Sequence, residues 1–292
     1  MVMPSPEILL SALVNGVLLG AIYALVALGL TLIYGVLHII NFAHGSLLML
    51  AMYAVYFLLA VGKVDPYFAL PIMVPAMFAV GWLLYRLVIG RLSRGLDQNI
   101  LLVTLGLSIV IENAALFFWT ADTRSITTPY SYEMIEIGSM LVALPKAVSF
   151  VAALLLCLAL WLAIERTDLG RAIRAVAKER QGARLVGIDV EQMFAVSYGI
   201  GIACLGAAAC LLMPIFYVSP SSGHVFVIVA FTIVVLGGMG SFVGALVGGL
   251  IIGVTESLGG LVLGESLGQI GISLIFILIL LLRPTGLFGG AR

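Results

Sequence analysis

The 27 residues Ile8–Tyr34 contain no charged side chain. A lipid hydrocarbon core of about 30 Å is crossed by about 20 helical residues, because each residue adds 1.5 Å to a helix. Further apolar runs occupy residues 46–61, 67–89, 99–119, 147–164, 193–213, 218–236, 242–258 and 267–282. We therefore expect a chain that crosses a membrane many times.

Composition supports this expectation. Hydrophobic residues make up 63% of the chain and charged residues 10%, whereas about a quarter of a soluble domain is charged. The runs lack the strict alternation of a membrane barrel, which favours helices. We predict an all-α integral membrane protein, a polytopic bundle of eight or nine transmembrane or re-entrant helices. It forms a single membrane-spanning domain over residues 1–292. The net charge of zero gives no reason to expect nucleic acid.

Lys and Arg predict the orientation, because they concentrate in cytoplasmic loops. Placing the basic segments inside leaves three of the 14 Lys and Arg outside, namely Lys63, Arg124 and Lys146. The loops at 120–146 and 219–224 then face outwards. The N-terminus lies outside if the chain crosses the membrane nine times and inside if it crosses eight times. The basic residues on the inside are Arg86, Arg91, Arg94, Arg166, Arg171, Arg174, Lys178, Arg180, Arg184, Arg283 and Arg292.

Residues 165–192 form the long polar segment of the cytoplasmic side. Thr167 or Asp168 can cap a helix there, and Gly182 would end it. Arg171, Arg174 and Lys178 share one face of that helix, with apolar residues elsewhere. One interpretation is that these charges only set the orientation. The other is that a helix with basic and apolar sides docks another protein.

Residues 35–48, GVLHIINFAHGSLL, place polar residues and glycines between two apolar runs. A break in a membrane helix exposes backbone groups, which is tolerable only against protein or a wet cavity. Asn41 and His44 then either belong to a cytoplasmic turn, with Asn41 capping the next helix, or line the transport path.

Glycines predict closely packed helices in two places, the glycine-rich segment 234–253 and the pair Gly16 and Gly20. The alternative for the segment 234–253 is a moving gate.

Glu112 and Glu256 lie inside apolar runs, towards their outer ends. Ionisable groups are costly in lipid, so both are candidates for a polar path or for structural hydrogen bonds. His224 has the position of a simple surface residue in an outer loop. The sequence has no P-loop, no pattern of a catalytic nucleophile and no metal-ligand spacing. We expect no enzymatic activity, no catalytic residue, and no metal or cofactor bound by this chain.

Four motifs then match a known family in order. Residues 15–45, 170–189, 234–258 and 280–289 resemble the LivH-type inner-membrane permease of branched-chain amino acid ABC importers. The resemblance implies a multi-pass protein of the bacterial inner membrane that imports branched-chain amino acids or related small polar solutes. It also implies four kinds of partner: a LivM-type permease, two cytoplasmic ATPases that bind ATP and Mg, a periplasmic solute-binding protein, and the lipid bilayer.

The resemblance further implies that residues 170–189 couple the permease to an ATPase. The coupling candidates are Arg171, Arg174, Lys178, Glu179, Gly187 and Asp189. The candidates for the substrate pathway are Asn41, His44, Ser46, Glu112 and Glu256.

Two positions depart from the family pattern. Ser46 stands where many members have Glu, and Val229 stands where many have Lys. If either position touches the solute, the chain prefers something other than leucine, isoleucine and valine; relatives handle urea, short amides and aromatic acids. The alternative function is a stand-alone proton-coupled transporter or channel that uses Glu112 or Glu256.

Overall fold

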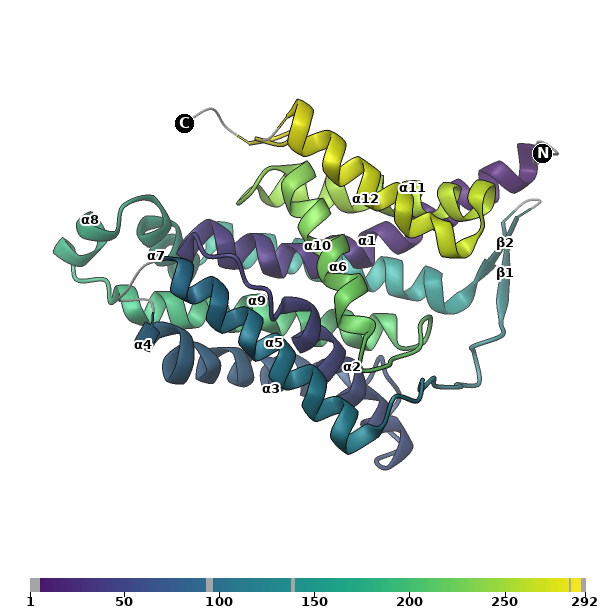
Figure 1. Cartoon of the computed structure of the whole chain (residues 1–292), viewed down its shortest axis with the longest axis horizontal. Helices are drawn as coiled ribbons and strands as arrows, with labels where there is room; N and C mark the ends of the chain where they lie inside the picture. The colour runs from purple at the N-terminus through teal and green to yellow at the C-terminus, as the bar shows by residue number, and fades with distance from the viewer. Residues whose placement is uncertain (1–5, 93–96, 138–139, 284, 290–292) are drawn as a thin grey trace.

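The computed structural model describes residues 6–92, 97–137, 140–283 and 285–289, and its regular structure is almost entirely helical (Figure 1). The elements of the first half are α1 Pro6–Leu37, α2 His44–Ala60, α3 Leu70–Leu84, the π-helical turn Tyr85–Ile89, α4 Gly90–Leu92, α5 Asp97–Trp119, β1 Met134–Ile137 and β2 Met140–Ala143. Those of the second half are α6 Leu144–Arg166, α7 Asp168–Lys178, α8 Arg180–Leu185, α9 Val190–Leu212, α10 Ser222–Gly237, α11 Phe242–Leu263 and α12 Glu265–Leu282.

The helices match the apolar runs of the sequence. Among the described residues, six helices are long and apolar enough to cross a membrane, and three shorter apolar helices accompany them, at His44–Ala60, Ser222–Gly237 and Ile270–Leu282. The expected polytopic all-α bundle is confirmed. An antiparallel hairpin, with Met134 opposite Ala143, was not expected within the loop at 120–146. Its apolar residues are too few to form a run that stands out beside the helices.

Helices α1 and α9 pass side by side through the centre of the bundle (Figure 1). Both are apolar on all sides, and α9 and the part of α1 from Gly16 onwards are largely buried, whereas the first turns of α1 are exposed. This is expected for helices that contact protein rather than lipid in every direction. The other long helices surround them and leave much of their own surface exposed.

Glycines bring α1 and α11 into backbone contact. A Cβ atom at Gly20 would lie 2.7 Å from the carbonyl oxygen of Gly249, and one at Gly253 would lie 2.5 Å from the Gly20 backbone. No side chain fits in this contact, so the close packing predicted for these glycines is confirmed.

The molecule has two chemically different ends. The Lys146 Nζ at the start of α6 donates to Asn15 Oδ1 of α1 (3.2 Å), and the Ser149 hydroxyl donates to the Leu211 carbonyl oxygen of α9 (3.0 Å). The starts of α1 and α6 and the end of α9 therefore lie together, at the end that carries the hairpin (Figure 1). We call this the hairpin end.

The opposite end carries α7 and α8 and most of the described basic residues, and we call it the basic end (Figure 1). Lys63, Arg124 and Lys146 lie at the hairpin end, as the charge pattern predicted. Arg94 and Arg292 lie outside the described residues.

Candidate functional site

The first feature of the site is the depth at which α2 begins. The Nε2 atom of His44, the first residue of α2, lies 3.0 Å from the Val26 carbonyl oxygen. Eleven helical residues separate Val26 from Leu37 at the basic end, a rise of about 16 Å. Asn15, at the hairpin end, lies equally far in the other direction. Residues 38–43 therefore turn back into the bundle, and α2 starts near its middle.

The break between α1 and α2 is held by a helix that lies far away in the sequence. The Phe42 backbone N–H donates to the Thr104 hydroxyl of α5 (3.3 Å), and this hydroxyl lies 3.4 Å from the Ile40 carbonyl oxygen. The Asn41 Oδ1 accepts from the Ala43 backbone N–H (3.1 Å). This hydrogen bond closes a turn just before α2. The N-cap of α2 is Ala43, so Asn41 does not cap the helix directly.

The buried polar atoms of the break leave hydrogen-bonding capacity unused. Asn41 and His44 are fully buried, and Asn41 Nδ2 and His44 Nδ1 have no partner among the described residues. The Ser46 hydroxyl lies 2.7 Å from the Ser108 hydroxyl of α5. In this conformation protein encloses all three residues, and a role for them in the transport path stays a prediction.

The Glu112 carboxylate contacts His224, a partner that was not predicted from the sequence. The Nε2 of His224, in the first turn of α10, lies 3.0 Å from Oε1 and 2.9 Å from Oε2 of Glu112 on α5. The imidazole side chain is 62% exposed and the carboxylate 20%. His224 is therefore a surface residue, as expected, but one whose imidazole contacts the Glu112 carboxylate. The two residues are 112 positions apart, so no local pattern signals the contact.

A small groove begins at His224. Its volume is about 120 Å³, and its walls come from α10 and α12. The lining residues are His224, Val225, Ile228, Val229, Ile272 and Ser273. Val229, one of the two departures from the family pattern, therefore lines a groove, whereas Ser46 lies in a buried helix contact.

Glu256 has a different environment. Its carboxyl lies against the Tyr23 hydroxyl of α1, and its Oε2 is buried without a hydrogen-bond partner among the described residues. The neighbouring Ser257 hydroxyl donates to the Ala12 carbonyl oxygen (2.6 Å). Glu256 thus belongs to the contact between α11 and α1, whereas Glu112 belongs to the contact between α5 and α10.

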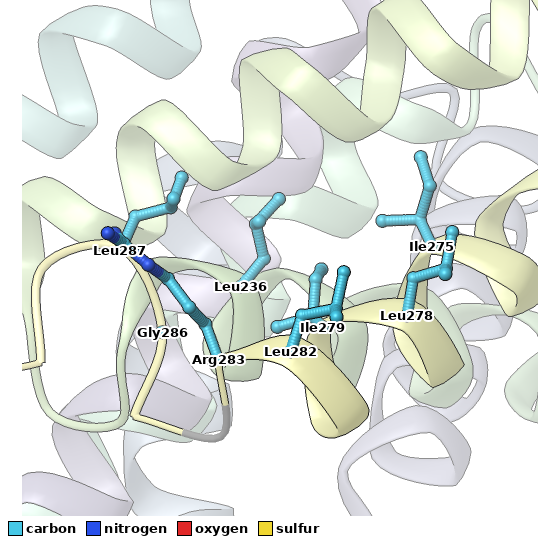
Figure 2. A pocket seen from close by; sticks show the side chains of 8 residues that line it. All are labelled: Leu236, Ile275, Leu278, Ile279, Leu282, Arg283, Gly286 and Leu287. Atoms are coloured by element: carbon cyan, nitrogen blue, oxygen red, sulfur yellow. The ribbon is translucent and has the colours of Figure 1, made fainter.

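A larger cavity of about 210 Å³ opens at the basic end (Figure 2). Leucine and isoleucine side chains of α10 and α12 line it, with Arg283 at one side. Arg283 is the single polar side chain among these lining residues, so the cavity offers little to a polar solute.

The coupling segment is a folded unit at the basic end. Thr167 caps α7, accepting from the Gly170 backbone N–H (3.1 Å), while Ile173 and Val176 form its buried side. Arg174 pairs with Glu165 (2.8 Å). The helix ends at Lys178, not at Gly182 as the sequence suggested. Glu179 interrupts it there with extended backbone and caps α8 instead.

The coupling candidates fall into two groups. Glu179 accepts from the Gln181 backbone N–H and Asp189 from that of Gln192, so both cap helices, and Gly187 holds a left-handed turn at φ 85°. Arg171 pairs with Asp168 on the surface, and Lys178 is exposed. The first group shapes the segment, whereas the second is available to a partner.

Three residues of this segment have features that were not predicted from the sequence. Leu185 and Val186 are 89% and 75% exposed at its tip, although both are apolar. Arg180 Nη2 donates to the Leu37 carbonyl oxygen (2.9 Å), which joins α8 to the last residue of α1. An apolar pair in a polar stretch was the available signal for the tip. Nothing local indicates the contact of Arg180.

Residues 12–283 match the family described as branched-chain amino acid transport system / permease component. The chain belongs to this family. It is 35% identical to the high-affinity branched-chain amino acid transport system permease protein BraD of Pseudomonas aeruginosa, over 97% of both chains. It is 32% identical to the corresponding LivH of Escherichia coli, over 96% of this chain and 95% of the other.

A solved structure shows the same fold. PsaBC from Streptococcus pneumoniae, in complex with Fab, matches with a TM-score of 0.51 and 14% identity, over 96% of this chain and 94% of that one. The resemblance to the LivH-type permeases is therefore confirmed over nearly the whole length of the permease, and its all-helical fold recurs in a solved protein.

Proposed function

We propose that the chain is the permease subunit of an ATP-driven importer for branched-chain amino acids or related small polar solutes in the bacterial inner membrane. The observation that carries the proposal is the tip of the coupling segment. Leu185 and Val186 are exposed at the basic end, on a segment whose helices are individually capped. An exposed apolar pair on a rigid element is typical of a protein-docking site.

The proposed orientation follows from charge. The positive-inside rule assigns the basic end to the cytoplasm, where α7 and α8 can meet an ATPase. We propose that two such ATPases carry the ATP and Mg, that a LivM-type permease covers one flank of this subunit, and that a binding protein delivers the solute at the hairpin end.

The connection from the docking tip to the membrane runs through Arg180. Its guanidinium bonds the last carbonyl of α1 and stacks over the Phe194 ring of α9 at 4.9 Å. A shift of α8 therefore acts on the start of the break at residues 38–43, beyond which α2 begins in the middle of the bundle.

A stand-alone proton-coupled carrier has no such observation in its favour. The relatives that match over most of the chain are permease components of transport systems. The Glu112 carboxylate contacts the His224 imidazole, and Glu256 lies in a helix contact.

Uptake into vesicles tests the proposal. The chain is purified with its co-purifying proteins, reconstituted with ATP inside, and supplied with the loaded binding protein outside. We expect uptake of labelled L-leucine or a related solute that needs ATP hydrolysis and persists when a proton gradient is collapsed. Uptake by the chain alone, abolished by collapse of the gradient, would contradict the proposal.

A further inference from the structure

Glu112 lies within α5, and His224 lies in the first turn of α10. Glu112 is seven helical residues, about 10 Å, from Trp119 at the hairpin end of α5. Trp119 stacks on Tyr53 with ring centroids 4.3 Å apart, and Trp and Tyr are enriched at membrane boundaries. Ionisable groups within a membrane-spanning helix face water or protein rather than lipid. The flank at this pair therefore borders either protein or a polar path.

The pair places a carboxylate beside an imidazole. Glu112 supplies a carboxylate from α5. His224 supplies an imidazole from the first turn of α10, where the positive end of a 16-residue helix adds to it. An ammonium group can pair with the first, and a carboxylate with the second.

The groove next to the pair is mostly apolar, with Ser273 as a further polar lining residue beside His224. Val229 and Ile272 are almost fully buried in its walls, and Ile228 is partly exposed at its edge. The volume of about 120 Å³ offers a small cavity for an aliphatic group. A carboxylate, an imidazole and a mostly apolar cavity thus lie next to one another on one flank.

We propose that Glu112, His224 and this groove bind the solute during its passage. The α-ammonium group pairs with Glu112, the α-carboxylate with His224 and the start of α10, and an aliphatic side chain enters the groove. The solute class is therefore a neutral amino acid with an aliphatic side chain. This inference rests on the proposed function and names the solute of that transport path.

The same chemistry disfavours the other solutes of related systems. Urea and short amides carry no charge for either partner. An organic anion would meet Glu112, and an organic cation would meet His224, so each would gain one contact and lose the other.

Charge removal tests the pair. The complete importer is reconstituted with saturating loaded binding protein, and initial uptake of labelled L-leucine is measured for Glu112→Gln and His224→Gln. We expect uptake at least tenfold lower for each, with ATP hydrolysis still stimulated by the binding protein. Glu133→Gln, a carboxylate in the loop before the hairpin, is the matched control and should transport at the wild-type rate.

An exchanged pair separates binding from helix pairing. Glu112→His combined with His224→Glu keeps a carboxylate and an imidazole in contact between α5 and α10 but puts the carboxylate at the positive end of α10. We expect uptake to stay low. Full recovery by the exchange would show that the pair only joins two helices and would overturn the inference.

Solute variants complete the test. L-leucine should compete for uptake, whereas 4-methylpentanoate, 3-methylbutylamine and urea should not. Ile228→Phe should lower leucine uptake severalfold, and Ile277→Phe, equally exposed on α12 but outside the groove, should not. Wild-type leucine transport that survives in Glu112→Gln, or transport of urea alone, contradicts this inference. An absence of ATP-dependent uptake of every solute instead contradicts the proposed function.

Discussion

At the residue scale, buried hydrogen bonds between side chains join helices that are distant in the sequence. The hydroxyls of Ser46 and Ser108 face each other across α2 and α5, and Thr104 holds the break one turn nearer the basic end. Each of these hydroxyls depends on its partner, because a buried polar atom that loses its hydrogen bond has no water to replace it.

Ser46 and Ser108 give a prediction at this scale. Ser46→Ala and Ser108→Ala should each lower stability by about 1 kcal/mol, because each leaves the other hydroxyl without its partner. The double variant should cost less than the sum, because it leaves neither hydroxyl unpaired. The losses of stability in the two single variants and the double variant are measured by thermal melting of the purified proteins in the same detergent. Strictly additive losses would show that the two hydroxyls do not interact.

At the element scale, glycines and the coupling segment decide how the helices sit. The backbones of α1 and α11 touch, so neither helix can move outwards without losing a long contact. The coupling segment contacts α1 through α7 and through the hydrogen bond of Arg180 to the Leu37 carbonyl oxygen.

Because α1 and α11 are in backbone contact, we expect one added side chain between them to lower the stability of the protein strongly. Gly253→Val should destabilise the protein by about 1–3 kcal/mol, because its side chain has to push the backbone of Gly20 away. Gly106→Val is the matched control on α5, where a Cβ atom meets nothing within 4 Å. Yield and melting temperature in detergent compare the two. Equal losses would contradict the packing described above.

We expect that replacing Arg180 uncouples solute uptake from ATP hydrolysis but leaves the importer assembled. Arg180→Met should keep ATP hydrolysis by the assembled importer but lower solute uptake, because α8 no longer holds the end of α1. Arg184→Met, an exposed arginine on the same helix, should behave as wild type. The ratio of solute transported to ATP hydrolysed is the quantity to measure. An unchanged ratio in Arg180→Met would refute this route of coupling.

Sequence patterns predicted the elements better than their contacts. Apolar runs long enough to cross a membrane located the helices, and the caps and charges of residues 165–192 located the coupling segment. The depth at which α2 begins was not predictable, because it depends on His44 meeting Val26 across the bundle. The partner of Glu112 was missed for the same reason, since His224 comes from a different helix.

At the scale of the whole molecule, the bundle has a buried centre, exposed flanks and two different ends. We propose that the flanks contact lipid or a second subunit and that the two ends face opposite sides of the membrane. The exposed pair Leu185 and Val186 lies at the basic end. We propose that an ATPase binds at this end and drives the permease.

Co-purification of ATPases tests this claim most directly. The tagged chain is extracted from its native membrane in mild detergent, as wild type, as Leu185→Glu, and as Leu141→Glu, an exposed leucine of the hairpin. We predict that ATPases carrying nucleotide-binding motifs accompany the wild type and Leu141→Glu, and that Leu185→Glu loses them while its yield is kept. A wild-type chain that comes without any ATPase, or a Leu185→Glu chain that retains them in full, would contradict the account.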